Sequence, residues 1–141
     1  MIMSDLSKLV RHMRVFAERS MADEGLGFPD QLVLMLLADG KPTNQEQIAR
    51  ALDVDKGAIA KTIGKLEDKG LVVRSENKRN RREKSVAATP LAAEAYECMK
   101  RGLALWNDRL YEGVSEDERQ IFEAVLARMA NNSNELIREG R

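Results

Sequence analysis

Two short amphipathic segments, separated by a tight turn, lie in the middle of the chain and limit what it can fold into. The first follows Asn44, a helix-capping residue, and Gln47 three residues later completes a capping-box pattern. The second follows Asp55, another capping residue, and stops at Gly70, a residue type that commonly ends helices. The faces expected to be buried are formed by Ile48, Ala49 and Leu52 in the first segment and by Ile59, Thr62, Ile63 and Leu66 in the second. Two short helices joined by a tight turn predict a helix-turn-helix.

A hairpin with a basic tip is predicted directly after these helices. Residues 71–73 form a short apolar strand, and residues 85–88 return as a second strand. Between them, six cations crowd into eleven positions against two acids: Arg74, Lys78, Arg79, Arg81, Arg82 and Lys84. Such a density of like charge is self-repelling unless phosphates supply the counter-charge. The alternative is an exposed loop that happens to be rich in charge.

The net charge of the chain is zero, which taken alone argues against nucleic-acid binding. The charge is unevenly distributed, however. Residues 41–86 contain twelve basic and seven acidic residues, a net charge of +5, and the rest of the chain carries −5. A basic middle between acidic ends keeps nucleic-acid binding open as a function.

On the amino-terminal side, residues 4–22 have apolar side chains at three- and four-residue steps, which predicts an amphipathic helix. A turn at residues 25–27 separates it from a second helix that Pro29 can open. This second helix is so apolar that we expect it to be buried. Residues 41–43 then form a connector or a minor strand.

On the carboxyl-terminal side, Thr89 and Pro90 predict the N-cap and first residue of a long helix. Its apolar face is expected to carry Leu91, Ala95, Met99, Leu103, Trp106 and Leu110. A last helix begins after Ser115, with Glu118 in capping-box register. Because aromatic residues make up only 4% of the chain, the core must consist mainly of aliphatic side chains, which fits a largely helical fold.

Several classes of chemistry find no support in the sequence. One His and one Cys are too few for a structural zinc site or a disulfide, so we expect the protein to bind no metal. No nucleophile–base pair or phosphate loop is visible, so we also expect no cofactor and no enzymatic activity. Cys98 is interpreted as a core or interface residue, with redox sensing as the alternative, and His12 as a surface or interface residue. No signal peptide or membrane span is seen, which predicts a soluble, cytoplasmic protein.

The exposed side of the second short helix combines lysines with small residues: Lys56, Gly57, Ala58, Ala60, Lys61, Gly64 and Lys65. Such a face allows a helix to enter a major groove about 12 Å wide, where lysines reach phosphates or guanine edges and methyl groups contact thymine. The alternative is a solvated, lysine-rich face on an ordinary helix.

Over nearly its whole length the chain resembles the MarR family of winged helix-turn-helix regulators. Residues 44–52 (NQEQIARAL) resemble the family's T-Q-x-E-L-A-x-x-L helix, and residues 54–56 and 66–74 (LEDKGLVVR) resemble its recognition helix and the following G-L-V-x-R strand. Residues 80–82 (NRR) stand where the family's wing carries D-R-R, and Thr89 stands at its L-T helix start.

This resemblance implies a mainly α fold with a small β-hairpin in one domain, residues 1–141. Residues 29–89 would be the winged helix-turn-helix lobe, and residues 4–24 and 90–139 would be dimerisation helices. The implied function is that of a homodimeric, sequence-specific regulator of transcription, acting as a repressor on a pseudo-palindromic site in double-stranded DNA. The resemblance also implies release by a small aromatic or phenolic effector. The rival function is a winged-helix module that binds another protein.

Two features depart from the family pattern. Asn80 replaces an Asp whose carboxylate holds the neighbouring wing arginine, so Arg82 is expected to be less rigidly aimed. Gly57 and Gly64 lie in the recognition helix, where each costs about 1 kcal/mol against Ala, so this helix is expected to be only marginally ordered without DNA. The residues predicted to contact DNA are Asn44, Gln45, Lys56, Gly57, Ala58, Ala60, Lys61, Lys65, Arg74, Arg79, Arg81 and Arg82.

Overall fold

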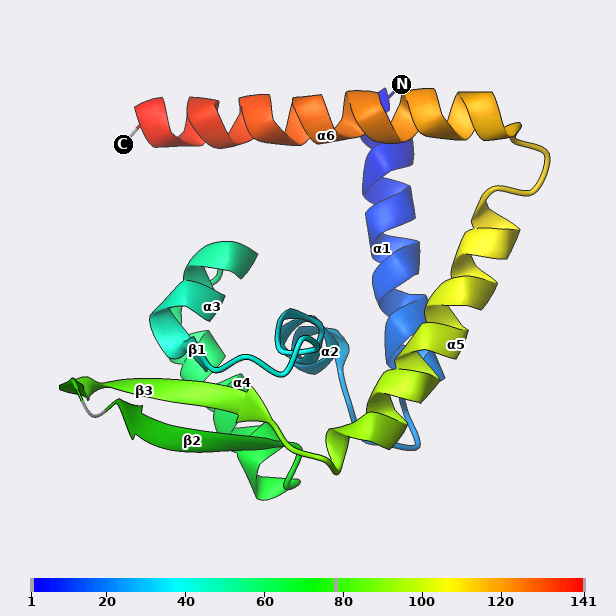
Figure 1. Cartoon of the computed structure of the whole chain (residues 1–141). Helices are drawn as coiled ribbons and strands as arrows, with labels where there is room; N and C mark the ends of the chain where they lie inside the picture. Colours follow the sequence, from blue (N-terminus) through cyan, green and yellow to red (C-terminus); the bar gives the residue numbers. More distant parts are fainter. Residues whose placement is uncertain (1, 78, 141) are drawn as a thin grey trace. The chain divides into compact units, whose positions relative to one another are not determined.

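The computed structural model of the chain describes residues 2–77 and 79–140, with the backbone alone at residues 2, 77 and 80–83. Figure 1 shows the elements in chain order, which are α1 (Ile2–Ser20), α2 (Phe28–Leu36), β1 (Thr43–Asn44), α3 (Gln45–Leu52), α4 (Lys56–Asp68), β2 (Val72–Asn77), β3 (Asn80–Ala88), α5 (Ala92–Leu110) and α6 (Glu116–Glu139). The protein is mainly α-helical with a small antiparallel sheet and carries a winged helix-turn-helix, which confirms the predicted fold class.

The chain divides into two compact units, residues 1–104 and residues 105–141. The first unit contains the helix-turn-helix (α3 and α4), the sheet, α1, α2 and most of α5. The second contains the end of α5 and all of α6.

The sheet of the first unit has the strand order β1-β3-β2, with both pairs antiparallel. β1 is the minor strand that the sequence left open as one of two possibilities, and it places Thr43 opposite Val86. β2 and β3 form the predicted hairpin, in which Val72 lies opposite Ala88. The sheet therefore ties the start of α3 to the hairpin that follows α4.

The core of the first unit lies where α2, α3 and α4 meet the sheet. Its fully buried members include Val33, Leu34, Leu37, Ile48, Ile63, Leu66 and Val86. Each such side chain stabilises the fold by about 2 kcal/mol through loss of contact with water. Of the faces predicted to be buried, Thr62 and Leu52 are only half-buried.

The caps predicted for the two helices of the helix-turn-helix are present. The Asn44 side chain accepts a hydrogen bond from the Gln47 amide at 2.7 Å, and the Gln47 side chain accepts one from the Asn44 amide at 3.2 Å. The Asp55 carboxylate accepts from the Ala58 amide, and Gly70 follows α4 with a φ of +74°. These caps fix both helix starts and allow the chain to leave α4 directly into β2.

Two expectations for the other helices of the first unit are wrong. α2 is not buried throughout, because Met35 and Leu36 are 52% and 38% exposed, and its buried positions include the polar Asp30 and Gln31 beside Val33 and Leu34. α5 begins at Ala92 and not at Pro90, and Thr89 is tied to the end of α4, because its hydroxyl donates to the Gly70 carbonyl and its amide donates to the Leu71 carbonyl. The predicted apolar face of α5 is correspondingly broken, with Ala95 buried but Leu91 largely exposed.

In the second unit, α6 begins with the predicted capping box between Ser115 and Glu118. In this box the Ser115 amide donates to the Glu118 carboxylate, and hydrogen bonding to this amide and to the Ser115 side chain lowers the pKa of Glu118. Behind the cap, Glu123 accepts hydrogen bonds from Arg119 and from the Tyr111 hydroxyl, both at 2.9 Å, and the Arg119 guanidinium lies over the Tyr111 ring. This cluster ties Tyr111, which directly follows α5, to the first turns of α6.

Candidate nucleic-acid interface

α4 has one buried side and one exposed side. Ile59, Ile63 and Leu66 hold it in the core. Across the helix, the predicted contact residues Lys56, Gly57, Ala58, Lys61 and Lys65 are exposed, and Ala60 is half-buried. Gly57 is the second residue of the helix, so the cost expected for an interior glycine applies to Gly64 alone.

The amino-terminal ends of α3 and α4 are linked by an ion pair. Lys56 donates to Glu46 at 2.8 Å, and Arg50 lies 3.9 Å from the same carboxylate. The hydrogen bond and charge of Lys56 lower the pKa of Glu46. All three groups are exposed, so solvent screens the pair and Lys56 remains available for an incoming phosphate.

Asn44 and Gln45 stand at the start of α3, as predicted. The Asn44 oxygen is used by the cap, which leaves the side-chain NH2 group as its donor toward an outside partner. Gln45 is the first residue of the helix and is half-buried.

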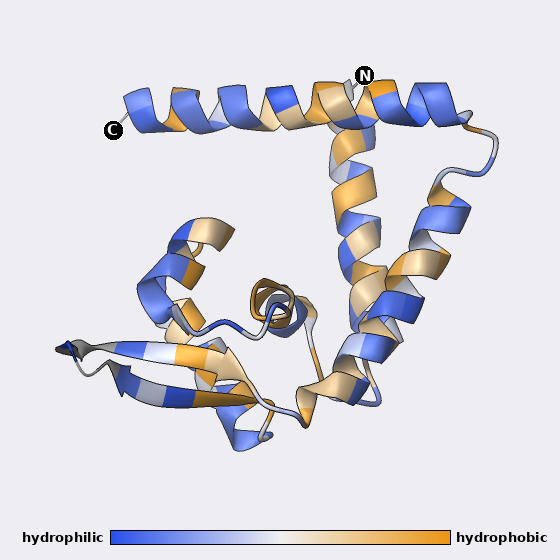
Figure 2. Cartoon of the chain, in the orientation of Figure 1, coloured by the Kyte–Doolittle hydropathy of each residue, from blue (hydrophilic) through white to orange (hydrophobic). Residues whose placement is uncertain are grey.

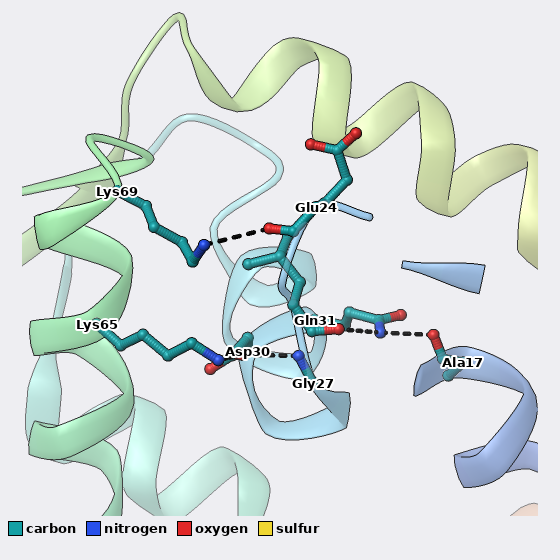
Figure 3. Close-up of polar contacts among 8 residues, drawn as sticks. Ala17, Glu24, Gly27, Asp30, Gln31, Lys65 and Lys69 are labelled. Atoms are coloured by element: carbon teal, nitrogen blue, oxygen red, sulfur yellow. Dashed lines mark hydrogen bonds and ion pairs between the residues drawn. The ribbon is translucent and has the colours of Figure 1, made fainter. Parts of the chain in front are cut away.

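Lys65 has a partner within the protein. Its ammonium group donates to the Asp30 carboxylate at 2.6 Å, and Asp30 is only 4% exposed (Figure 3). One turn further along α4, Lys69 donates to the Glu24 carbonyl at 3.2 Å. Sequence reasoning missed Asp30 because nothing local links it to a lysine 35 positions away. Its capping-box spacing after Gly27 was the available signal.

Arg74 is likewise turned toward the protein. Its side chain is 24% exposed, its Nε lies 3.7 Å from a Glu67 oxygen, and this nitrogen has no hydrogen-bond partner among the described residues. A Cβ built at Gly64 would lie 3.6 Å from Nη2 of Arg74, so the guanidinium lies across the α4 backbone at that glycine. Arg74 therefore packs the base of the hairpin against α4.

The tip of the hairpin has an irregular register. Glu76 lies opposite Lys84, but its neighbour Asn77 lies opposite Asn80, so residues 81–83 of β3 have no counterparts on β2. Arg79 is exposed in the turn between the strands. The side chains of Asn80, Arg81 and Arg82 lie outside the described residues, so their expected roles stay predictions.

Metal binding and membrane crossing are two further properties on which the described residues bear. No group of three or more His, Cys, Asp or Glu side chains there could hold a metal ion. No helix in that part of the chain is both long and apolar enough to cross a membrane. Cys98 is half-buried, with its Sγ 3.9 Å from the Ser20 carbonyl oxygen.

Comparisons with known proteins agree with this architecture. Residues 29–84 match the model of the MarR family. A protein of Thauera aromatica described as a transcriptional regulatory protein for the hcr operon is 27% identical over 122 residues, which cover 86% of this chain and 74% of that protein.

Solved structures extend the likeness beyond the matched lobe. A MarR transcriptional regulator from Methanosarcina mazei Go1 has a TM-score of 0.88 at 27% identity, with 96% of this chain and 97% of that chain covered. The crystal structure of MarR has a TM-score of 0.82 at 28% identity, with 95% and 98% covered. CouR from Rhodococcus jostii RHA1, solved bound to p-coumaroyl-CoA, shares the fold at 24% identity, with a TM-score of 0.80 and 92% and 91% covered. The match over residues 29–84 shows a MarR-family region in this chain, and the likeness in fold to MarR regulators spans nearly its whole length.

Proposed function

We propose that this protein is a DNA-binding transcriptional regulator that acts as a homodimer on a pseudo-palindromic duplex site. The observation that carries the proposal is the exposed face of α4, where lysines and small residues lie opposite a buried apolar side and a basic hairpin follows. A major groove accepts a helix of this kind, and its phosphates neutralise the surrounding cations.

In this proposal α4 is the recognition helix. Lys61 is exposed and forms no ion pair with a described residue, so it is assigned to a phosphate or a guanine edge. Lys56, Gly57, Ala58 and Ala60 share the surface that enters the groove. Asn44 and Gln45, at the start of α3, contact the sugar-phosphate backbone.

The hairpin is the wing. Arg79, Arg81 and Arg82 are assigned to the flanking minor groove, whose negative potential attracts arginine. Lys65 and Arg74 are left out of the DNA-contacting set, because each is directed at an acidic side chain of the protein.

A second copy of the chain would bind through the helices at the two ends. Apolar side chains exposed on α1, α5 and α6 include Val10, Met13, Leu103, Leu105, Ile121, Phe122, Val125 and Met129. Exposed apolar surface of this extent marks an interaction site. Two-fold symmetry then presents two α4 helices to successive major grooves.

Repression by occlusion of a promoter follows from binding of this kind, and a small aromatic or phenolic ligand relieves it by favouring a spacing of the two lobes that does not match the groove repeat. Support for the ligand comes from the family resemblance and from CouR, a protein of the same fold that was solved with an aromatic acyl thioester.

Binding of promoter-derived and random duplexes, measured by fluorescence anisotropy at several salt concentrations, tests the function. We expect binding that weakens steeply with salt and prefers some sequences. Lys61→Met should weaken binding roughly tenfold and reduce the salt slope by about one unit, whereas Lys100→Met, at an exposed lysine of α5, should change neither. Absence of duplex binding at low salt would contradict the proposal and favour the protein-binding module.

A further inference from the structure

A buried polar junction joins the start of α2 to α4. Asp30 is 4% exposed, and one of its carboxylate oxygens accepts two hydrogen bonds, from the Gly27 amide at 2.8 Å and from Lys65 at 2.6 Å. Figure 3 shows Lys65 reaching across from α4 to this carboxylate. A carboxylate this far from water requires such partners, so the pair is a fixed part of the fold.

The neighbouring residue extends the junction to α1. Gln31 is 7% exposed, and its amide donates to the Ala17 carbonyl at 2.9 Å and to the Leu26 carbonyl at 3.1 Å. Two consecutive residues of α2 thus hold α1 on one side and α4 on the other (Figure 3). Lys69 adds a second link between α4 and the α1–α2 connection through the Glu24 carbonyl.

The direction of these contacts matters for α4. Its buried side consists of aliphatic residues, and contacts between aliphatic groups are non-directional, so they resist separation of the helices more than a small rotation about the helix axis. A charge-assisted hydrogen bond depends on distance and angle. Lys65 is one turn after Lys61, so a rotation that breaks its contact also moves the groove-facing residues.

We propose that Asp30 and Lys65 are positioning residues for DNA recognition, which set the orientation of α4 against the α1–α2 junction, and that Lys65 acts through Asp30 rather than by touching DNA. The inference rests on the proposed function and deepens it. It also separates two lysines of one helix that look alike in the sequence: Lys61 binds the duplex, and Lys65 holds the helix that carries Lys61.

The test compares Asp30→Asn, Lys65→Met and the double variant in duplex binding across a salt series, at a temperature where circular dichroism shows each to be folded. We expect each single variant to bind at least tenfold more weakly with the salt slope of the wild type. The double variant should be no weaker than the worse single variant, because both changes break one interaction. Lys65→Arg, which can still pair with Asp30, should bind within threefold of the wild type.

The control is Lys61→Met, which should reduce the salt slope. A slope reduced to the same degree in Lys65→Met, with Asp30→Asn unaffected, would overturn the inference by making Lys65 a phosphate contact. Wild-type affinity in both single variants, with only a lower melting temperature, would reduce the pair to a stabilising contact and also overturn it. If a single variant does not fold, the double variant takes its place, because it leaves no unpaired charge in the junction. Weaker duplex binding by the double variant, with the salt slope of the wild type, then supports the positioning role, and wild-type affinity contradicts it.

Amide hydrogen exchange without DNA separates failure of this inference from failure of the proposed function. We expect faster exchange in residues 56–68 of both single variants, with Lys61→Met unchanged. Unchanged exchange in Asp30→Asn and Lys65→Met would overturn the positioning role whatever the wild type binds. Faster exchange in a protein that binds no duplex would contradict the proposed function but support the coupling of α4 to the junction.

Discussion

At the scale of single residues, Tyr96 shows how one polar atom joins two helices. Its hydroxyl, carried on α5, donates to the Leu34 carbonyl of α2 at 2.6 Å. Burial raises the pKa of this phenol, and the negative charge of Asp39 raises it further. The neutral form is therefore the one that the folded protein favours.

Tyr96→Phe tests this hydrogen bond. Near neutral pH we expect a loss of about 1 kcal/mol in the free energy of unfolding, the usual net value for such a bond. Because the folded-state pKa lies above the usual tyrosine value of 10.0, the unfolded chain loses its proton first, and wild-type stability falls as pH rises past that value. The difference between wild type and variant should therefore shrink at alkaline pH, as measured by urea unfolding. A difference independent of pH would contradict this account.

The polar residues also show what could be predicted from the sequence. The caps at Asn44, Asp55 and Ser115 were predictable because donor and acceptor lie three residues apart, so local pattern determines them. The pair of Asp30 and Lys65 was not, because it forms only after α2 and α4 pack. The sequence predicts Lys65 to be a DNA contact because the residues near a lysine on an exposed helix face do not reveal which group it will pair with.

At the scale of elements, α4 has one glycine in its interior and another just after its end. Gly64 lies in the helix interior, where the guanidinium of Arg74 crosses it, and Gly70 ends the helix with positive φ. The two glycines therefore differ in what a methyl group would do. At Gly64 the added carbon would meet Nη2 of Arg74 at an ordinary contact distance of 3.6 Å, whereas at Gly70 it would be strained by backbone conformation.

We expect Gly64→Ala to raise the free energy of unfolding by about 0.5–1 kcal/mol through helix propensity, and Gly70→Ala to lower it by about 1 kcal/mol or more. Thermal or urea unfolding of both variants beside the wild type measures the difference. Destabilisation by Gly64→Ala would mean that the contact between Arg74 and α4 is tighter than the structure shows.

The helices outside the helix-turn-helix were less well predicted in detail. The high apolar content of residues 32–37 predicts burial of α2, yet Met35 and Leu36 are exposed in the single chain and the polar Asp30 and Gln31 are buried. Local pattern predicts that α5 starts at Pro90, but the helix starts at Ala92, and the Thr89 hydroxyl donates to the carbonyl of Gly70, 19 residues earlier. In both cases contacts distant in sequence determine the outcome.

At the scale of the whole molecule, α6 is a long helix with no buried side chain among its 24 described residues. Figure 2 shows apolar residues interspersed among hydrophilic ones along its length. A helix of this kind gains most of its stability from packing, which in the proposed dimer comes from a second copy.

Replacement of Ile121 and Val125, four residues apart, by Asp should prevent this association. Sedimentation velocity is expected to give the wild type twice the chain mass of 15.9 kDa and the variant a single chain mass. Asn132→Asp, an exposed polar position on the same helix, serves as the control and should remain dimeric. A wild type that sediments as a monomer at micromolar concentration would contradict the proposed assembly.

The exposure of α6 also makes concentration a factor in folding. If a second copy supplies the missing contacts, dilution below the dissociation constant of the dimer acts on this helix as a denaturant does. Newly made chains at low abundance would then carry frayed ends that proteases cleave, and the first stable molecules would appear only after enough copies had accumulated. The amount of active regulator would rise more steeply than its rate of synthesis, so that a modest change in expression would have a disproportionate effect.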